Sequence, residues 1–497
     1  MSGSSKPVSI RPTRSSDTTV WRIGMGVGFL LLGISVSEIA LGGDWLRSSA
    51  ITGAATAVDR TGNQAQSGLV LQVTPQFGLT GRSGRSMADV NYQLTMSLGL
   101  GSTDPRPLAH NLVAIGEVEA VEDFFFLGAN AGARLGGSSS FAESIDAINF
   151  NADQGRQSFS VGLMPRFVAH LNRYVDLVSN NAVNYVTYSD DSAGGDDSSF
   201  GTRLHLGARS GRYFGPWSWR ADAAQRKTTY QSDSTRDSTR SHAELGIGYP
   251  INAHLLLRGG IGYENNDIQT SRSVTSGSIW DVGLLWKPNP RTSLNAKFGS
   301  RYFGDAWSVF ATHRTRRSQL TLGTSRDADN RRTEELVDSN LFLLDDDGFV
   351  VTDPNTGDPI SAVIPNFEDT NEDFINTRIR GILRLTGRRT TVTLTGEVSN
   401  RDYEVSPIDE DAFRVSFAAS RQIGSEFIGT AAGDFDRRKR QDGVDSDIYT
   451  IGFTLSRQIA RKTSVSLNLM HRNRSSSVPS AEYTENRIGV ALTTSLL

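Results

Sequence analysis

The chain has 497 residues, a formal net charge of −3, no cysteine and 49 glycines, and 37% of its residues are apolar. The absence of cysteine excludes disulfides, thiolate metal sites and a lipid-anchored cysteine. The small net charge gives no electrostatic reason to expect nucleic acid as a partner. The continuous apolar runs that a large soluble β-protein needs for its core are missing. This composition favours strands of which only one face is apolar.

Residues 1–42 have the pattern of a secretory signal peptide. Basic residues precede an apolar run from Ile23 to Val36, and Ala40-Leu41-Gly42 offers small residues at the spacing that a signal peptidase recognises. The alternative is a membrane-anchoring helix, but the run is shorter than the roughly 20 residues that a spanning helix needs. We therefore predict a signal peptide at 1–42 and a single domain at 43–497.

The stretch 278–305 shows the design that most of the chain repeats. Apolar side chains from Trp280 to Trp286 alternate with small or charged ones. A Lys-Pro-Asn-Pro turn follows, and the alternation resumes from Leu294 to Tyr302. A period of two is typical of a β-strand with one apolar face and one polar face.

The same period predicts 21 clear strands along the chain. They are 69–80, 88–100, 110–121, 123–135, 157–169, 173–188, 201–210, 216–230, 241–249, 254–264, 276–287, 291–303, 305–313, 317–326, 373–386, 390–402, 411–421, 426–438, 446–457, 462–474 and 482–496. A bacterial outer-membrane barrel normally closes with an even number of strands. The weaker segment Ile51–Val58 supplies another strand, so we predict an all-β, antiparallel up-and-down transmembrane barrel of about 22 strands, with about 20 as the alternative.

The connections alternate between short and long when they are followed back from the C-terminus. Short ones lie at 457–461, 421–425, 386–389, 314–317, 287–290 and 250–253, and long ones at 475–481, 438–446, 402–410, 327–372 and 265–275. Outer-membrane barrels have short periplasmic turns and longer outer loops. The alternation therefore predicts which end of each strand faces the periplasm.

Basic residues recur on the polar faces of the strands. Because a charge on the lipid face costs several kcal/mol near the midplane, we expect these side chains to point into the lumen. The lumen-lining candidates are Arg203, Arg209, Arg258, Lys297, Arg301, Arg378, Arg380, Arg384 and Arg414. An arginine-lined lumen favours anions or binds sugars through hydrogen bonds. The alternative is that these residues pair with lumen carboxylates and only stiffen the wall.

The segment Asp327–Asp373 holds 14 acidic residues and two basic ones. It is predicted to be a solvated outer loop over 327–372. The alternatives are a segment that folds into the lumen as a constriction or lid, or one that binds a divalent cation through oxygen ligands. The spacing of its carboxylates does not follow the calcium-loop pattern, so no metal site is predicted.

No catalytic constellation stands out in the sequence. The seven histidines are scattered, and the motifs of serine hydrolases and zinc proteases are absent from suitable contexts. His205 and His471 are strand residues that could belong to a site built from neighbouring strands, although each is more simply an ordinary lumen or interfacial histidine. We predict no enzyme activity, no catalytic residues and no cofactor.

Five short stretches occur in an order that resembles one protein family. They are VEDFFFLGA at 121–129, GYEN at 262–265, WKPNPRTSL at 286–294, RYFG at 301–304 and YTENR at 483–487. The chain resembles the outer-membrane proteins associated with the PEP-CTERM/exosortase system, which are found near exopolysaccharide biosynthesis genes. The resemblance implies a porin-like barrel that serves as an exit for a secreted polysaccharide. The chain departs from the usual barrel ending because Leu497, and not an aromatic residue, is last.

These observations lead to one expectation and several rivals. We expect a channel in the Gram-negative outer membrane that supports exopolysaccharide export. Its expected partners are outer-membrane lipid, the transported polysaccharide, the barrel-assembly machinery and periplasmic export components. The rivals are a general small-solute porin, a barrel enzyme acting on lipid or polysaccharide, and a structural barrel without an open pore.

Overall fold

The computed structural model describes residues 44–62, 65–137, 155–189, 198–211, 213–231, 237–330, 373–406 and 409–496. The described residues from Trp45 onward belong to one compact unit. The predicted signal peptide and most of the predicted acidic loop lie outside the described residues. Among the residues described, no helix is long and apolar enough to cross a membrane.

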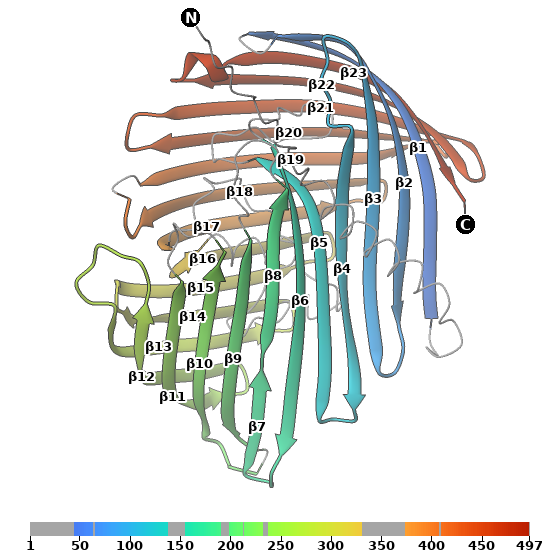
Figure 1. The fold of residues 1–497 in the computed structure, drawn as a ribbon. Coiled ribbons are helices and arrows are strands. Elements are labelled where there is room, and N and C mark those ends of the chain that lie inside the picture. Colours follow the sequence, from blue (N-terminus) through green and yellow to red (C-terminus); the bar gives the residue numbers. More distant parts are fainter. Residues whose placement is uncertain are drawn as a thin grey trace, which may run out of the picture. The chain divides into compact units, whose positions relative to one another are not determined.

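The described residues form one antiparallel sheet of 23 strands (Figure 1). The first twelve are β1(Asp44–Gly62), β2(Gln66–Arg82), β3(Ser86–Gly101), β4(Leu108–Val121), β5(Phe125–Gly137), β6(Gly155–His170), β7(Val175–Asn180), β8(Ala182–Ser189), β9(Ser199–Ser210), β10(Ser218–Tyr230), β11(Ser238–Asn252) and β12(Leu255–Asp267). The others are β13(Ser276–Asn289), β14(Thr292–Arg301), β15(Gly304–Arg314), β16(Ser318–Asn330), β17(Asp373–Thr386), β18(Thr390–Tyr403), β19(Glu410–Ile423), β20(Phe427–Arg440), β21(Asp445–Ala460), β22(Thr463–Ser476) and β23(Tyr483–Ser495), with one short 3₁₀ helix, η1(Pro479–Ala481).

The sheet closes on itself because its first and last strands pair. β1 and β23 run antiparallel in unbroken register from Ala50 opposite Ser495 to Gly62 opposite Tyr483. Closure leaves no open sheet edge, and so the backbone N–H and C=O groups of the strands are satisfied within the sheet. In Figure 1, strands β1–β6 cross in front of β17–β23 at a steep angle, as the tilted strands on opposite walls of a barrel do.

Strands β7 and β8 together fill one place in the barrel. Both pair with β6 on one side and with β9 on the other. The register against β6 is the same before and after the break at Asn181, which lies next to Pro165 and donates its backbone N–H to the Pro165 carbonyl at 3.0 Å. Proline has no N–H to return, so the ladder is interrupted there. The described strands thus fill 22 places, which confirms the predicted barrel and its strand number.

The connections alternate in length as the sequence predicts. One end of the barrel, here called the short-turn end, carries connections such as 253–254, 315–317 and 461–462. The opposite end, the long-loop end, carries connections such as 268–275 and 477–482. Several strands are longer than predicted, β1 among them, and one difference bears on the acidic segment: β16 continues to Asn330, so the predicted loop does not begin at Asp327. The reason is that Asp327–Asn330 pair with the start of β17.

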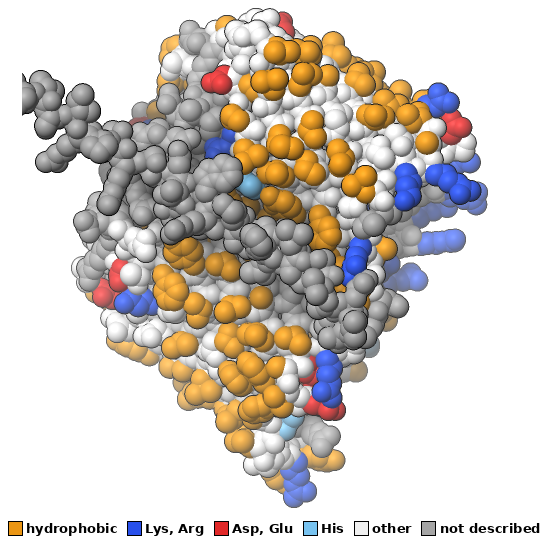
Figure 2. Space-filling view, turned by 45° about the vertical axis from the view of Figure 1, so that its right-hand side comes forward, with side chains coloured by type: hydrophobic (Ala, Val, Ile, Leu, Met, Phe, Trp, Pro, Cys, Tyr) orange, Lys and Arg blue, Asp and Glu red, His pale blue; other side chains and the backbone are white. Residues whose placement is uncertain are grey.

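The two faces of each strand differ, as β23 illustrates. Ile488, Val490 and Leu492 are 59%, 51% and 47% exposed despite their apolar side chains, whereas Glu485 and Arg487, at the alternate positions of the same strand, are 0% and 6% exposed. The apolar side chains therefore face outward, and the charged ones face inward. Figure 2 shows apolar side chains spread over the outward surface, with Lys and Arg gathered toward its margin. An apolar exterior on a closed sheet is the arrangement of a membrane-spanning barrel.

Val415 and Ser416 in the middle of β19 test this assignment, because they are neighbours on opposite faces. We expect Val415→Arg to lower the free energy of unfolding by about 2 to 4 kcal/mol, the cost of a basic side chain at the lipid midplane. The matched variant Ser416→Arg places a guanidinium group inside the barrel, opposite Asp434. It should change the free energy of unfolding by less than about 1 kcal/mol. Urea unfolding in lipid vesicles measures both; equal losses would contradict the assignment of faces.

Candidate functional site: the inner face of the barrel

The nine basic residues predicted to line the lumen all occupy inward positions, which alternate with the outward apolar side chains. In β9, for example, Arg203 and Arg209 share a face with buried His205, while Leu204 and Leu206 are 56% and 60% exposed. The other seven follow the same alternation in β12, β14, β17 and β19. Their role in transport stays a prediction, and their contacts show what each side chain does within the wall.

Several of these residues form ion pairs with inward carboxylates. Glu397 lies opposite Arg380 in the β17–β18 register. Its Oε1 lies 3.6 Å from Arg378 Nε, and its Oε2 lies 3.7 Å from Arg380 Nε. Arg414 Nε donates to Asp434 Oδ1 at 2.9 Å. Ion pairs of this kind hold neighbouring strands together, which favours the wall-stiffening interpretation for these three arginines.

Lys297 and Arg301 belong to a larger charged network on β10–β16. Lys297 Nζ lies 3.3 Å from Asp281 Oδ2 and 4.0 Å from Glu244 Oε2. Arg301 Nη2 donates to Glu264 Oε2 at 2.7 Å, and its Nη1 donates to Asp327 Oδ1 at 3.3 Å. Because Glu264 and Asp327 lie on strands on either side of β14, Arg301 ties the inner wall across several strands.

Arg258 and Arg384 differ from the residues above. Arg258 donates to the amide oxygen of Asn295, a neutral partner. Arg384 is exposed near the short-turn end, and its cross-strand neighbours, Gln319 in β16 and Thr393 in β18, are neutral. The positive charge of Arg384 is therefore not neutralised by a carboxylate directly opposite it.

At the long-loop end, Arg240 joins strands that are far apart in the sheet. Its guanidinium donates to the Asp373 carboxylate of β17 at 2.5 Å and to the carbonyls of Ala328 and Asp329 in β16 at 2.8 and 3.2 Å. Arg240 itself lies in β11, so these contacts cross the inner side of the barrel past four intervening strands to β16 and past five to β17. Ser238 Oγ also donates to Asp373 at 3.2 Å. The wall from β11 to β17 is thus drawn together at this end.

A second tie at the long-loop end involves the connection between β12 and β13. Arg272 Nε donates to both carboxylate oxygens of Glu404 at 3.0 and 2.9 Å, and the backbone N–H of Ser271 donates to the Glu404 carbonyl at 2.7 Å. The Glu404 side chain is fully buried, and Thr270 donates to it as well. In the β14–β15 turn nearby, burial raises the pKa of the Tyr302 phenol above its ordinary value, so Tyr302 stays neutral. The inner side of this end is therefore narrowed by hydrogen-bonded, charged side chains.

Further buried ion pairs lie on the inner face in the half of the barrel nearer the long-loop end. Their residues were not among the predicted lumen-lining residues. In β20, Arg438 pairs with Asp436 at 2.8 Å. In β23, Arg487 pairs with Glu485, whose carboxylate also lies 4.0 Å from Arg60 of β1. The signal in the sequence is an acid and a base two residues apart on one strand face. It is easily overlooked, because the same spacing also suits an exposed strand.

Toward the short-turn end the inner face changes character. In β19–β22 its side chains there are small and neutral, and most are half-buried: Ser416, Ala418 and Ser420 in β19, Thr430 and Ala432 in β20, Thr454 and Ser456 in β21, and Ser464 and Ser466 in β22. Small side chains leave the lumen wide on this side. The inner face thus runs from a small, neutral region near the short turns to a charged region near the long loops.

The geometry offers no complete catalytic group in the described part of the chain. His205 Nε2 lies 3.2 Å from Asp222 Oδ1 on the inner face, but its Nδ1 atom is buried without a hydrogen-bond partner, so no hydroxyl nucleophile is engaged. His471 faces outward and contacts Asn486 at 2.8 Å. No cluster of three or more His, Asp or Glu side chains suited to a metal is found among the described residues.

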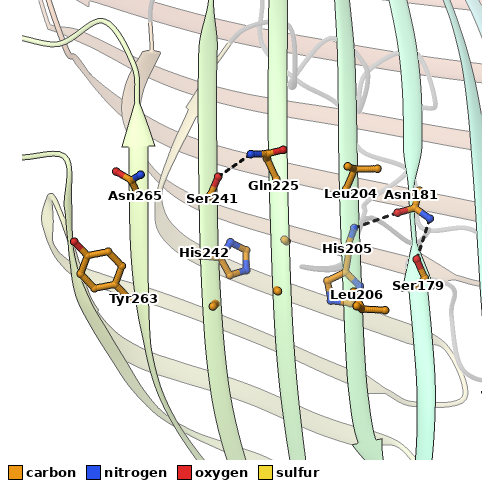
Figure 3. A pocket seen from close by; sticks show the side chains of 13 residues that line it. Ser179, Asn181, Leu204, His205, Leu206, Gln225, Ser241, His242, Tyr263 and Asn265 are labelled. Carbon is orange, nitrogen blue, oxygen red and sulfur yellow. Dashed lines mark hydrogen bonds between the residues drawn. The ribbon is translucent and has the colours of Figure 1, made fainter.

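A shallow groove lies on the outward face of β9–β12 (Figure 3). Leu204, Leu206 and Tyr263 project around it, and the Gln225 amide donates to Ser241 Oγ at 3.3 Å on its floor. Most of its lining side chains are outward ones, although the inward His205 and His242 also contribute, so the groove opens on the membrane-facing surface.

No protein-family model matches the chain, and no curated protein matches it. Among solved structures, the chain is similar to the FrpB iron transporter from Neisseria meningitidis, with 9% identity, a TM-score of 0.49, and coverage of 92% of this chain and 82% of that one. It is also similar to the siderophore receptor PirA from Acinetobacter baumannii, with 9% identity, a TM-score of 0.46, and coverage of 90% and 80%. The PEP-CTERM/exosortase resemblance stays a prediction.

The Arg240 tie predicts a specific pattern of stability. Arg240→Ala removes the guanidinium group that contacts the Asp373 carboxylate, which is 4% exposed, and should lower the free energy of unfolding by about 3 to 5 kcal/mol. Adding Asp373→Asn removes the charge of that buried carboxylate and should restore about half of that loss. Urea unfolding in vesicles measures both variants. A double variant no more stable than Arg240→Ala would show that the charge pair is not what joins β11 to β17.

Proposed function

We propose that this protein is a channel of the Gram-negative outer membrane and that it supports export of an exopolysaccharide. The observation that carries the proposal is a closed barrel of 22 strand places with an apolar outside and a polar inside. A barrel of this size is too wide for its own inward side chains to fill. We place the short-turn end in the periplasm and the long-loop end at the cell exterior, as is usual for outer-membrane barrels.

The small inward side chains near the short turns support a polymer as the transported molecule. Serine, threonine and alanine leave space in the lumen, and the hydroxyl groups of serine and threonine offer weak hydrogen bonds to sugar hydroxyls without holding a chain tightly. The charged network near the long loops then forms a narrower exit. The order of the five sequence motifs supports the same substrate class, because the family that they resemble occurs near exopolysaccharide genes.

The rival with most support from the geometry is a barrel without a permanently open pore. The Arg240 and Glu404 ties narrow the inner side of the long-loop end. A general small-solute porin fits the wide, neutral region equally well. The location of the polymer in a deletion strain separates these possibilities from export.

A clean deletion in the producing organism tests the proposal. We expect polysaccharide to accumulate in the periplasm and to fall in the medium by roughly tenfold, while synthesis continues, because a long polymer has no passive route through the lipid. Complementation with the wild-type chain should restore secretion. Unchanged secretion with normal amounts of polymer in the medium would reject export as the function.

A further inference from the structure

The short-turn end carries a strong excess of positive charge over β13–β22. Twelve exposed basic residues lie in its turns and the adjacent strand ends: Lys287, Arg291, Arg314, Arg316, Arg317, Arg384, Arg388, Arg389, Arg421, Arg457, Arg461 and Lys462. The same turns and strand ends hold one carboxylate, Glu426, which contacts Arg457 at 3.1 Å. The excess charge is therefore not neutralised locally by acidic side chains.

Two of these residues face the lumen and lie in one row across the sheet. Arg314 of β15 is paired with Gln319 of β16, and Gln319 is paired with Arg384 of β17. The row continues to Thr393 of β18. With a strand spacing of about 4.8 Å, the two arginines are rooted roughly 10 Å apart with only a neutral side chain between them. No carboxylate interrupts the row, which we call the mouth row (Arg314, Gln319, Arg384).

The arginines deeper in the lumen contrast with the mouth row. Arg380 lies opposite Glu397, and Arg414 contacts Asp434 at 2.9 Å. The charge of these deeper arginines is compensated by carboxylates of the wall, whereas the exposed guanidinium groups of the mouth row are available to a ligand. An anion that enters the lumen from the short-turn side therefore meets these two guanidinium groups before it meets the paired ones.

We propose that the mouth row captures an anionic polysaccharide, one that bears carboxylate groups, at the periplasmic entrance of the barrel. This inference deepens the proposed export function and rests on it for its direction of transport. The ligand is extended, because the two guanidinium groups are rooted roughly 10 Å apart at the usual strand spacing, so that separate carboxylate groups of one chain meet them. A small anion would need a compact pocket instead. Guanidinium groups bind carboxylates through paired hydrogen bonds.

Lipid headgroups are the competing ligand for basic residues at this level of the membrane. Residues that point outward, such as Arg421 of β19 in the face of Phe417 and Ile423, meet headgroups at the interface. They provide a matched control, since removing them changes the net charge of the same rim without touching the inward row.

Binding of fluorescein-labelled oligogalacturonate to the full chain in phosphatidylcholine nanodiscs tests the proposal. We expect the wild-type chain to bind this probe and not labelled dextran. The double variant Arg314→Gln/Arg384→Gln should weaken binding by roughly tenfold or more, through the loss of two charge-assisted contacts. The control Arg421→Gln/Arg461→Gln, which combines the outward Arg421 with Arg461 of the β21–β22 turn, away from the mouth row, should stay within roughly twofold. Urea unfolding establishes that both variants are folded.

Each outcome decides between the two proposals. Equal weakening in both double variants would make the rim a general basic or headgroup-binding surface and would overturn the mouth row. Equal binding of dextran and oligogalacturonate would overturn the anionic substrate class. Selective binding without an export defect in the deletion strain would leave the mouth row standing while the export function fails. An export defect without selective binding would leave the export function standing and would overturn the mouth row.

Discussion

The constraint on which this structure depends is that lipid offers no partner to a backbone N–H or C=O group. A sheet can satisfy that constraint only by closing, and the pairing of β1 with β23 closes this one. Closure in turn gives every strand an outward face in lipid and an inward face toward the lumen. The period of two along the chain follows from these two environments, and not from a core between packed sheets.

The composition of the inner face then follows from the energetic cost of placing a charged side chain in lipid. Charged side chains are excluded from the lipid face, so they gather inside, where register decides which of them meet. Arg380 meets Glu397 because a short turn joins β17 to β18 and fixes their pairing. Near the short turns the inner side chains of β19–β22 are small and neutral, while Arg314 and Arg384 face inward on β15 and β17. Near the long loops the inner side chains are charged and joined by ion pairs and hydrogen bonds. The barrel is therefore graded along its axis, with unneutralised arginines at one mouth and paired charges at the other.

The parts that the sequence predicts are those governed by the period of two and by short turns. The strand number and the alternation of short and long connections belong to this group. The first strand was a weak prediction because the outward face of β1 carries Gly53, Ala55 and Ala57, whose small side chains leave little apolar signal. The inward orientation of the basic residues follows from the same alternation.

The contacts that narrow the lumen could not be predicted from the sequence. Arg240 and Asp373 lie on β11 and β17, and no local pattern shows that strands so far apart in the sheet approach each other. Arg301 likewise reaches Glu264 two strands away. Such contacts depend on how strongly the wall curves, which is a property of the whole closed sheet. Spacing along the chain therefore distinguishes poorly between arginines that line a path and arginines that brace a wall.

The central claim is that the inner face encloses a path through the membrane. Conductance of the full chain, reconstituted in a planar lipid bilayer, tests it most directly. The account predicts discrete current steps in the wild-type chain, and larger steps when Arg240→Ala/Asp373→Asn releases the tie at the long-loop end. A correctly folded barrel that passes no current in either form would contradict a path through the lumen and would leave a structural role for the barrel.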